Sequence, residues 1–278
     1  MTEQGVAELI AERMDAMSAG ERRAAQVLLA NYPLTGLKTV AEFSALAGVS
    51  SPTILRFVAR IGFTSYADFQ ARLQAELAAQ LQSPLMRATG RSDERDGSPS
   101  PYLAAALDNV EDTFRHLSEA QIAAVVASLS NLKGKVFLAG GRFTAPLATY
   151  MAAHLAIVRP GVFPLAGQES NWRDRLIDVG RNDVVVIFDI RRYQDSLLRL
   201  AETARQRGAR VVLFTDQWLS PVARHARHVV AAHTSAPSAW DSCVPLLLAA
   251  ETVVGELTRS LGEESARRIR EMEELRRG

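Results

Sequence analysis

Three short apolar runs, separated by helical stretches, constrain the second half of this chain more than any other feature. The runs are VFLAG (residues 136–140), DVVVIFDI (183–190) and RVVLFTD (210–216), and all are rich in β-branched residues. Stretches with helical spacing, 144–158 and 194–207, lie between them. Strands that are apolar along their whole length and alternate with helices predict a parallel sheet covered on both faces. Because crossovers between parallel strands are right-handed, we expect a doubly wound α/β domain.

Weaker strands are predicted at 161–165 and 228–232, which makes the sheet five-stranded. Helical stretches at 102–117 and 119–129 precede the sheet, and long helices at 240–261 and 263–275 end the chain.

The N-terminal section reads as helical throughout. Apolar residues recur at helical spacing over 11–17 and 24–30, and Ser18 ahead of Glu21 is a capping-box signature. Thr39 is expected to cap a further helix that ends at Ala47. Residues 83–101 are polar and rich in Pro, Gly and Ser, which indicates a linker between domains. We therefore predict an all-α domain at 1–82 and an α/β domain at 102–278.

Composition excludes several classes of protein. The chain has 32 Lys and Arg against 31 Asp and Glu, so a net charge of +1 gives no global attraction to DNA or to a membrane. Its single cysteine, Cys243, cannot form an intramolecular disulfide, which fits a reducing cytoplasm. The N-terminus lacks the pattern of a signal peptide, and the apolar runs are too short to span a bilayer. We expect a cytoplasmic protein with no membrane partner.

Residues 39–57 fit a helix-turn-helix. Gly48 sits where the chain must turn sharply, and glycine accepts a positive φ without strain. Ser50 or Ser51 is expected to cap the second helix, and Pro52 suits its first turn. Such a helix offers its exposed N-terminal half to the major groove of DNA. The predicted DNA-binding residues are Ser50, Ser51, Pro52, Thr53, Arg56 and Arg60.

Each of these residue types suits a part of the duplex. Arg56 can pair with guanine or hold a phosphate, whereas Ser50 and Thr53 suit phosphate oxygens. Between residues 47 and 72 the only charged groups are Arg56, Arg60, Arg72 and the acid Asp68. This small basic patch predicts weak binding by one copy, so a dimer is needed. The alternative is an ordinary helical hairpin whose arginines are solvated.

Two segments carry a family resemblance. MSAGERRAAQVLLANYP (residues 17–33) and TVAEFSALAGVSSPTILRFVARIGFTSYADFQARL (39–73) resemble the N-terminal domain of the RpiR/MurR family of bacterial transcriptional regulators. In that family a sugar isomerase (SIS) domain follows, and the order of parts here is the same. The resemblance implies DNA binding, self-association as a dimer or tetramer, and a sheet with strand order 2-1-3-4-5.

With that strand order, the loops after the first and third strands converge at the switch point, where doubly wound sheets bind ligands. Each loop leads into a helix N-terminus, which favours an anion. The loops are GGRFTA (140–145) and DIRRYQDS (189–196). The predicted ligand-binding residues are Gly140, Gly141, Arg142, Thr144, Asp189, Arg191, Arg192, Gln194 and Ser196.

Both loops depart from the SIS domains that bind phosphosugars, which resemble each other here. In the first loop, Arg142 stands at the second glycine and Thr144 lies near the serine. In the second loop, Asp189 and Arg191 replace serines, Arg192 replaces the glycine, and Gln194 replaces the threonine. In one interpretation the arginines bind an anionic metabolite, such as a phosphosugar, a sugar acid or another carboxylate. In the other, Asp189 pairs with an arginine and the loop braces the fold or a dimer contact.

We therefore predict a transcriptional regulator, not an enzyme, that binds an operator in double-stranded DNA and a small anionic effector, without a cofactor. One alternative is an SIS-type sugar-phosphate isomerase, for which Glu169 and the histidines are conceivable bases. Another is a regulator whose SIS domain only dimerises. His225, His228 and His233 lie close in sequence, but metal ligation needs another donor to converge on them, so no metal site is predicted.

Overall fold

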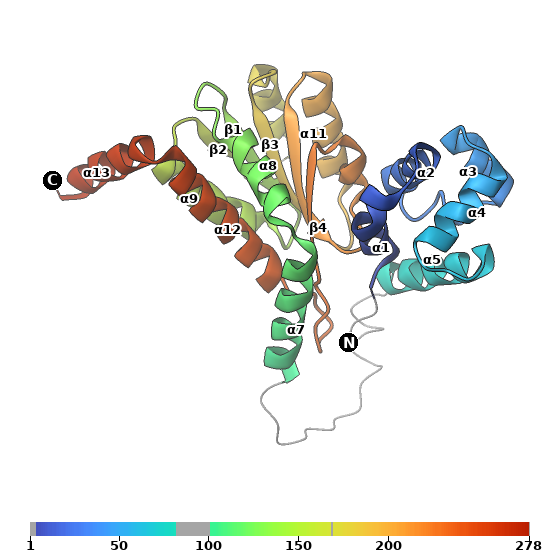
Figure 1. Ribbon diagram of the computed structural model, residues 1–278. Coiled ribbons are helices and arrows are strands. Elements are labelled where there is room, and N and C mark those ends of the chain that lie inside the picture. Colours follow the sequence, from blue (N-terminus) through green and yellow to red (C-terminus); the bar gives the residue numbers. More distant parts are fainter. Residues whose placement is uncertain (1–3, 82–100, 168, 278) are drawn as a thin grey trace.

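The N-terminal domain is a bundle of short helices (Figure 1). The computed structural model describes residues 4–81, 101–167 and 169–277. Residues 4–81 form no strand, as the sequence predicts. The helices are α1 (Val6–Arg13), α2 (Ala19–Ala30), α3 (Val40–Ala47), α4 (Ser51–Arg60) and α5 (Tyr66–Leu81), with a 3-10 turn at Met14–Ala16.

Apolar side chains at helical spacing form the core of this bundle. Phe43, Phe57 and Phe69 are fully buried, and the rings of Phe43 and Phe57 meet edge to face with centroids 6.2 Å apart. The predicted capping box at Ser18 and Glu21 is confirmed, since each side chain bonds the backbone N–H of the other residue. Thr39 caps α3 through the same geometry. These caps satisfy N–H groups that the first turn of a helix leaves without partners.

The C-terminal domain is built on one parallel sheet. Its strands lie in the order β2-β1-β3-β4-β5, which confirms the five strands and the order 2-1-3-4-5. The carboxyl ends of β1 and β3 lie side by side, because Gly140 pairs with Phe188. The strands are β1 (Val136–Gly140), β2 (Val162–Pro164), β3 (Val184–Asp189), β4 (Arg210–Asp216) and β5 (His228–Ala232).

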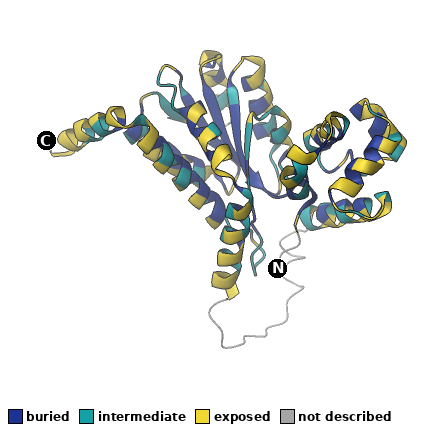
Figure 2. Cartoon of the chain, viewed as in Figure 1, coloured by how far each residue is buried: buried dark blue, intermediate teal, exposed yellow. Residues whose placement is uncertain are grey.

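Helices cover both faces of the sheet. Alternate strand residues enter two cores: Phe188 and Phe214 stack at 4.5 Å on one face, and Val185 and Ile187 pack on the other. Figure 2 shows the strands buried between exposed outer helix surfaces. One face carries α7 (Pro101–His116), α8 (Glu119–Leu129), α9 (Ala145–Val158) and α12 (Val244–Leu261), and the other carries α10 (Glu169–Arg175), α11 (Asp195–Gln206) and the 3-10 turns Leu176–Asp178 and Pro221–His225. A last helix, α13 (Glu263–Arg277), extends away from the sheet (Figure 1).

Two predicted boundaries shift. The helix predicted from residue 240 begins only at Val244, and Trp240 is instead half exposed with its ring 5.5 Å from that of Phe143. Residues 83–100 of the predicted linker lie outside the described residues, and Pro101 already opens α7.

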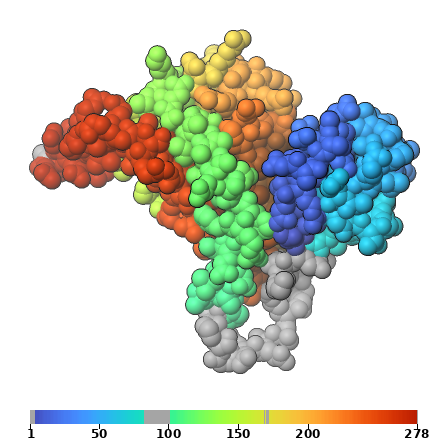
Figure 3. Space-filling view, in the orientation of Figure 1, coloured from blue at the N-terminus to red at the C-terminus, as the bar shows by residue number. Residues whose placement is uncertain are grey.

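The N-terminal domain packs against the C-terminal domain near the carboxyl ends of β4 and β5. Figure 3 shows its first helices in contact with the green α7 and with orange segments that follow β4. Glu12 of α1 lies 3.2 Å from Nδ1 of His116 in α7, and α2 contacts the turn Pro221–His225. Within residues 4–81, 101–167 and 169–277, no helix combines the length and the apolar character that crossing a bilayer requires.

Candidate DNA-binding surface and ligand-binding loops

The turn between α3 and α4 has the geometry that the sequence predicts. Gly48 adopts φ of 60°, a left-handed conformation in which a side chain would be strained. Ser50 occupies the N-cap position of α4, and Pro52 lies in the first turn. The hydroxyl of Ser50 does not cap the helix backbone, because it lies 2.9 Å from the hydroxyl of Thr53 instead.

Helix α4 has a buried face and an exposed face. Ile54, Phe57 and Val58 point into the bundle core. The opposite face is accessible to a partner because its residues are exposed. Half-buried Ser51 lies at the edge of this face. The exposed residues are Pro52, Leu55, Arg56, Ala59 and Arg60.

The prediction that Thr53 occupies an exposed or semi-exposed position is wrong. Its side chain is buried against α2. A Cβ added to Gly20 of that helix would stand only 3.0 Å from the methyl carbon of Thr53, so the two helices pack closely here. Its hydroxyl receives a hydrogen bond of 3.0 Å from Nη2 of Arg56. Thr53 therefore orients Arg56.

Leu55 is a residue of this face that sequence reasoning missed. The side chain is 48% exposed although it is large and apolar. Leu55 lies three residues after Pro52 and one before Arg56, so helical periodicity places it on the outer face of α4. That periodicity could have identified it from the sequence. An apolar side chain here suits the methyl group of thymine.

The two arginines of α4 differ in their partners. Arg60 lies 3.8 Å from Glu21 of α2, whose carboxylate is buried. Burial raises the pKa of Glu21, but hydrogen bonds from Ser18 and the charges of Arg60 and Arg56 outweigh it and lower that pKa overall. Glu21 therefore stays ionised and holds Arg60 toward α2, while Arg56 faces outward.

The two predicted ligand loops do converge. A Cβ added to Gly141 would stand 3.1 Å from Oε1 of Gln194 and 3.6 Å from Oδ1 of Asp189. At Gly140 a Cβ would stand 2.5 Å from the backbone of Thr144, so only glycine fits this tight turn. The first loop leads into α9 at Ala145, and the second leads into α11 at Asp195.

Inside these loops the side chains of Thr144 and Asp189 form hydrogen bonds that stabilise the fold. The Thr144 hydroxyl donates to the carbonyl of Phe188 at 2.6 Å and accepts from the amide of Gly141 at 2.8 Å. The Asp189 carboxylate accepts from the hydroxyl of Ser220 at 2.5 Å, so its partner is a serine rather than an arginine. Both side chains are 1% exposed, and they brace the turn beneath the loop surface.

A second buried carboxylate lies beside Asp189. Asp216, at the end of β4, accepts from the amide of Arg191, from the hydroxyl of Tyr193 and from the amide of Trp218. Burial raises the pKa of Asp189 to about 7, and burial likewise raises that of Asp216 to about 6. The loop after β3 is therefore held in place by two buried carboxyl groups whose ionised forms are disfavoured.

Arg191 extends toward the N-terminal domain. Its guanidinium is paired with Asp241 at 2.9 Å, donates to the carbonyl of Ala79 in α5 at 2.9 Å, and stacks on the ring of Trp218 at 4.0 Å. The residue is 8% exposed. Sequence reasoning assigned this arginine to a ligand, but the structure directs it to a contact between the domains.

Arg142 and Arg192 remain on the surface of the loops. Both are exposed, and neither forms an ion pair with another residue in the described ranges. Arg142 lies over the ring of Phe143 at 5.2 Å. Arg192 has φ of 67°, a left-handed conformation that is uncommon for residues other than glycine. Gln194 and Ser196, both half-buried, complete the predicted set.

Two family models divide the chain in the same way as its fold. One, described as a helix-turn-helix domain of the rpiR family, matches residues 4–80, and the other, the SIS domain, matches residues 128–254. The chain belongs to the RpiR family.

Two curated relatives are similar to this chain over most of its length. The HTH-type transcriptional regulator HexR of Escherichia coli is 26% identical over 256 residues, which cover 90% of this chain and 85% of that protein. The bifunctional protein glk of Burkholderia thailandensis is 25% identical over 227 residues, 80% of this chain. The chain spans only 34% of that longer relative.

Solved structures show the same fold. The NanR protein of Vibrio vulnificus, complexed with ManNAc-6P, aligns over 97% of both chains with a TM-score of 0.54 and 18% identity. The sugar isomerase domain of an RpiR transcription factor from Sphaerobacter thermophilus covers 64% of this chain and 99% of that one, with a TM-score of 0.59 and 22% identity.

One groove of the SIS domain contains the acid considered as an isomerase base. The groove, about 560 Å³, lies between α10 and α11 and includes Glu169, Ser196 and Arg199. Glu169 pairs with Arg173 at 2.7 Å and with Arg199 at 3.2 Å. The hydrogen bond from Arg199, followed by that from Arg173, lowers the pKa of Glu169. A carboxylate with a low pKa is a weak general base, which argues against isomerase chemistry here.

Proposed function

We propose that this RpiR-family protein binds operator DNA through α4 and that its SIS domain changes operator affinity when it binds a small anionic metabolite. The exposed face of α4 carries the proposal. This face, with Leu55 and Arg56 at its centre, offers both an apolar contact and a bidentate donor to base edges. Arg60, on the same exposed face, would contact a phosphate oxygen, and Pro52 would pack beside the duplex without donating a hydrogen bond.

The effector site is proposed at the loops after β1 and β3. Its support is the meeting of two loops that lead into helix N-termini, with Arg142 and Arg192 exposed above them. Gly140, Gly141, Gln194 and Ser196 would lie against the ligand, while Thr144 and Asp189 would brace the loops. A phosphosugar, a sugar acid or another carboxylate suits this charge, and the similarity to NanR, solved with ManNAc-6P, favours a phosphosugar.

Arg191 gives the proposed effector a route to the DNA-binding domain. The loop that would hold the anion also bonds Ala79 at the end of α5. An effector that prefers one conformation of this loop would thereby favour one placement of α4. A coupling of about 1–3 kcal/mol would change operator affinity roughly 5- to 150-fold.

Self-association is part of the proposal. One α4 reads too few base pairs for specific binding, so two copies must contact half-sites about one helical turn apart, or a multiple of that spacing. The dimer or tetramer would be held by the SIS domains, as the family resemblance implies.

The test couples a ligand screen to DNA binding. The intact protein selects its own operator from a pool of random duplexes, and phosphosugars and sugar acids are screened for a rise in melting temperature. A hit must then change operator affinity at fixed salt. A protein that selects DNA but responds to no anion would have an SIS domain that only dimerises. A protein that selects no sequence would refute the proposal.

A further inference from the structure

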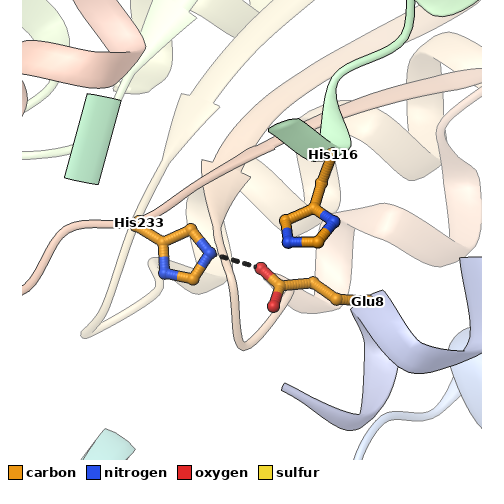
Figure 4. A group of neighbouring side chains, drawn as sticks. All are labelled: Glu8, His116 and His233. Atoms are coloured by element: carbon orange, nitrogen blue, oxygen red, sulfur yellow. Dashed lines mark ion pairs between the residues drawn. The ribbon is translucent and has the colours of Figure 1, made fainter. Parts of the chain in front are cut away.

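Three side chains that the proposed function does not use meet between the two domains. They are Glu8 of α1, His116 at the end of α7, and His233 in the segment that follows β5. One donor atom of each lies within 4.8 Å of a donor atom of the other two. Figure 4 shows the three side chains pointing toward one another.

The cluster is buried, and its hydrogen bonding is incomplete. Glu8 is 8% exposed and His233 is 3% exposed. Nε2 of His233 lies 2.6 Å from Oε1 of Glu8, but neither ring nitrogen of His233 forms a hydrogen bond of good geometry among the described residues. Buried polar groups usually have partners, so an imidazole buried with an unused nitrogen requires an explanation.

Outer groups orient two of the three side chains. The carboxylate of Glu12 faces Nδ1 of His116 at 3.2 Å, which leaves Nε2 of the same ring, now 3.5 Å from the side-chain amide nitrogen of Gln4, as the nitrogen that would bind a cation. The amide of Gly5 donates to Oε2 of Glu8 at 3.0 Å, which leaves Oε1 directed at His233. A carboxylate behind a histidine and a backbone donor on a ligating carboxylate are the supports that metal ligands commonly have.

We propose that Glu8, His116 and His233 form a binding site for a divalent transition-metal cation of the zinc type, which joins the DNA-binding domain to the SIS domain. Two imidazoles and one carboxylate are donors that Zn²⁺ accepts, with a fourth position left for water. Tetrahedral coordination at about 2.0–2.1 Å places ligand atoms roughly 3.3 Å apart. To reach that spacing, Nε2 of His233 and Oε1 of Glu8 would separate from 2.6 Å, and the other pairs, which lie within 4.8 Å, would close.

The three proposed ligands come from both domains, so metal binding depends on how the domains are docked. Glu8 comes from the N-terminal domain, whereas His116 and His233 come from the SIS domain. A cation can therefore hold all three only when the domains are docked as they are here. By mass action, metal shifts the protein toward this docked arrangement and thus toward one placement of α4.

The test measures zinc binding to the full chain after removal of metal with a chelator. We expect one Zn²⁺ per chain in a competition titration against a chromogenic chelator. Glu8→Gln and His233→Asn should each weaken binding by more than the roughly 10- to 100-fold expected for the outer residue Glu12→Gln. His154→Asn is the matched control, because His154 is exposed on α9 and lies outside the cluster.

A second measurement protects the test against misfolded variants. Co²⁺ added to the wild-type chain should give the intense visible absorption of tetrahedral coordination, and Glu12→Gln, on a partly exposed side chain, should keep the fold while weakening the site. Zinc affinity that is equal in the wild type, Glu8→Gln and Glu12→Gln would overturn the proposal. A Co²⁺ spectrum that matches the free aqueous ion would also overturn it, and would leave an interdomain ion pair of Glu8 with His233.

Discussion

Nη1 of Arg191 donates to the carbonyl oxygen of Ala79 at 2.9 Å, which links the loop after β3 to the last turn of α5. The same guanidinium is paired with Asp241 and stacked on Trp218. A loop of the proposed effector site thus contacts the DNA-binding domain directly.

Replacing Arg191 by alanine should destabilise the protein. The change removes the Arg191 guanidinium from the carboxylate of Asp241, which is 13% exposed, and breaking a buried ion pair costs about 3 kcal/mol of the free energy of unfolding. Arg192→Ala, at an exposed neighbour, should stay within about 0.5 kcal/mol. Chemical denaturation of both variants checks this, and equal stabilities would contradict the buried pairing.

The same two variants should separate coupling from ligand binding. Arg192→Ala removes an exposed cation from the proposed site, so effector affinity should fall by about 1.5–3 kcal/mol, the contribution of a charged hydrogen bond. Arg191→Ala should still bind effector, but the effector should no longer change operator affinity. Calorimetry with the effector and titrations of operator DNA measure the two quantities separately. If Arg191→Ala loses effector affinity as Arg192→Ala does, Arg191 is itself a ligand contact.

Asp189→Asn should change how stability depends on pH. The pKa of Asp189 is about 7 in the fold and near 3.8 when unfolded, so between these values the folded state holds a proton that the unfolded chain has lost. The contribution is therefore complete below about pH 4 and is lost as pH rises through 7. The melting temperature of Asp189→Asn, relative to wild type, should rise from pH 5 to pH 8. Exposed Asp178→Asn should show no such trend, and a flat difference for Asp189→Asn would refute the assignment.

Leu55→Ala should weaken operator binding without affecting stability. Its side chain is half exposed, so truncation leaves no cavity in the bundle core. If the side chain packs on a thymine methyl, the variant should lose affinity mainly for operators with thymine at one position. Affinities for operators substituted base by base check this. A uniform change across all substitutions would place Leu55 outside the base contacts.

Much of this fold could be predicted because its signals are local. Continuous apolar strands, the Ser18 and Thr39 caps and the turn at Gly48 each follow from a few neighbouring residues. The strand order came from the family resemblance, and the pairing of β1 with β3 confirms it.

The site was harder to predict, because its contacts join residues far apart in sequence. Arg191 was assigned to a ligand since its partners, Ala79 and Asp241, lie on other elements of the chain. For the same reason the sequence identified no further donor for His233, whereas Glu8 and His116 converge on it through domain docking. Thr53 was predicted to be exposed or semi-exposed because no local signal shows how closely α4 packs against Gly20 of α2.

The affinity of the intact protein for its selected operator, compared with that of Arg56→Ala, tests the central claim most directly. Arg56 is exposed on α4, so the variant should fold normally and lose about 1–3 kcal/mol of binding free energy. Arg267→Ala, an exposed arginine on α13, serves as the control and should bind as the wild type does. Operator affinity and salt dependence that are unchanged in Arg56→Ala would contradict the account, because α4 would then not be the surface that contacts DNA.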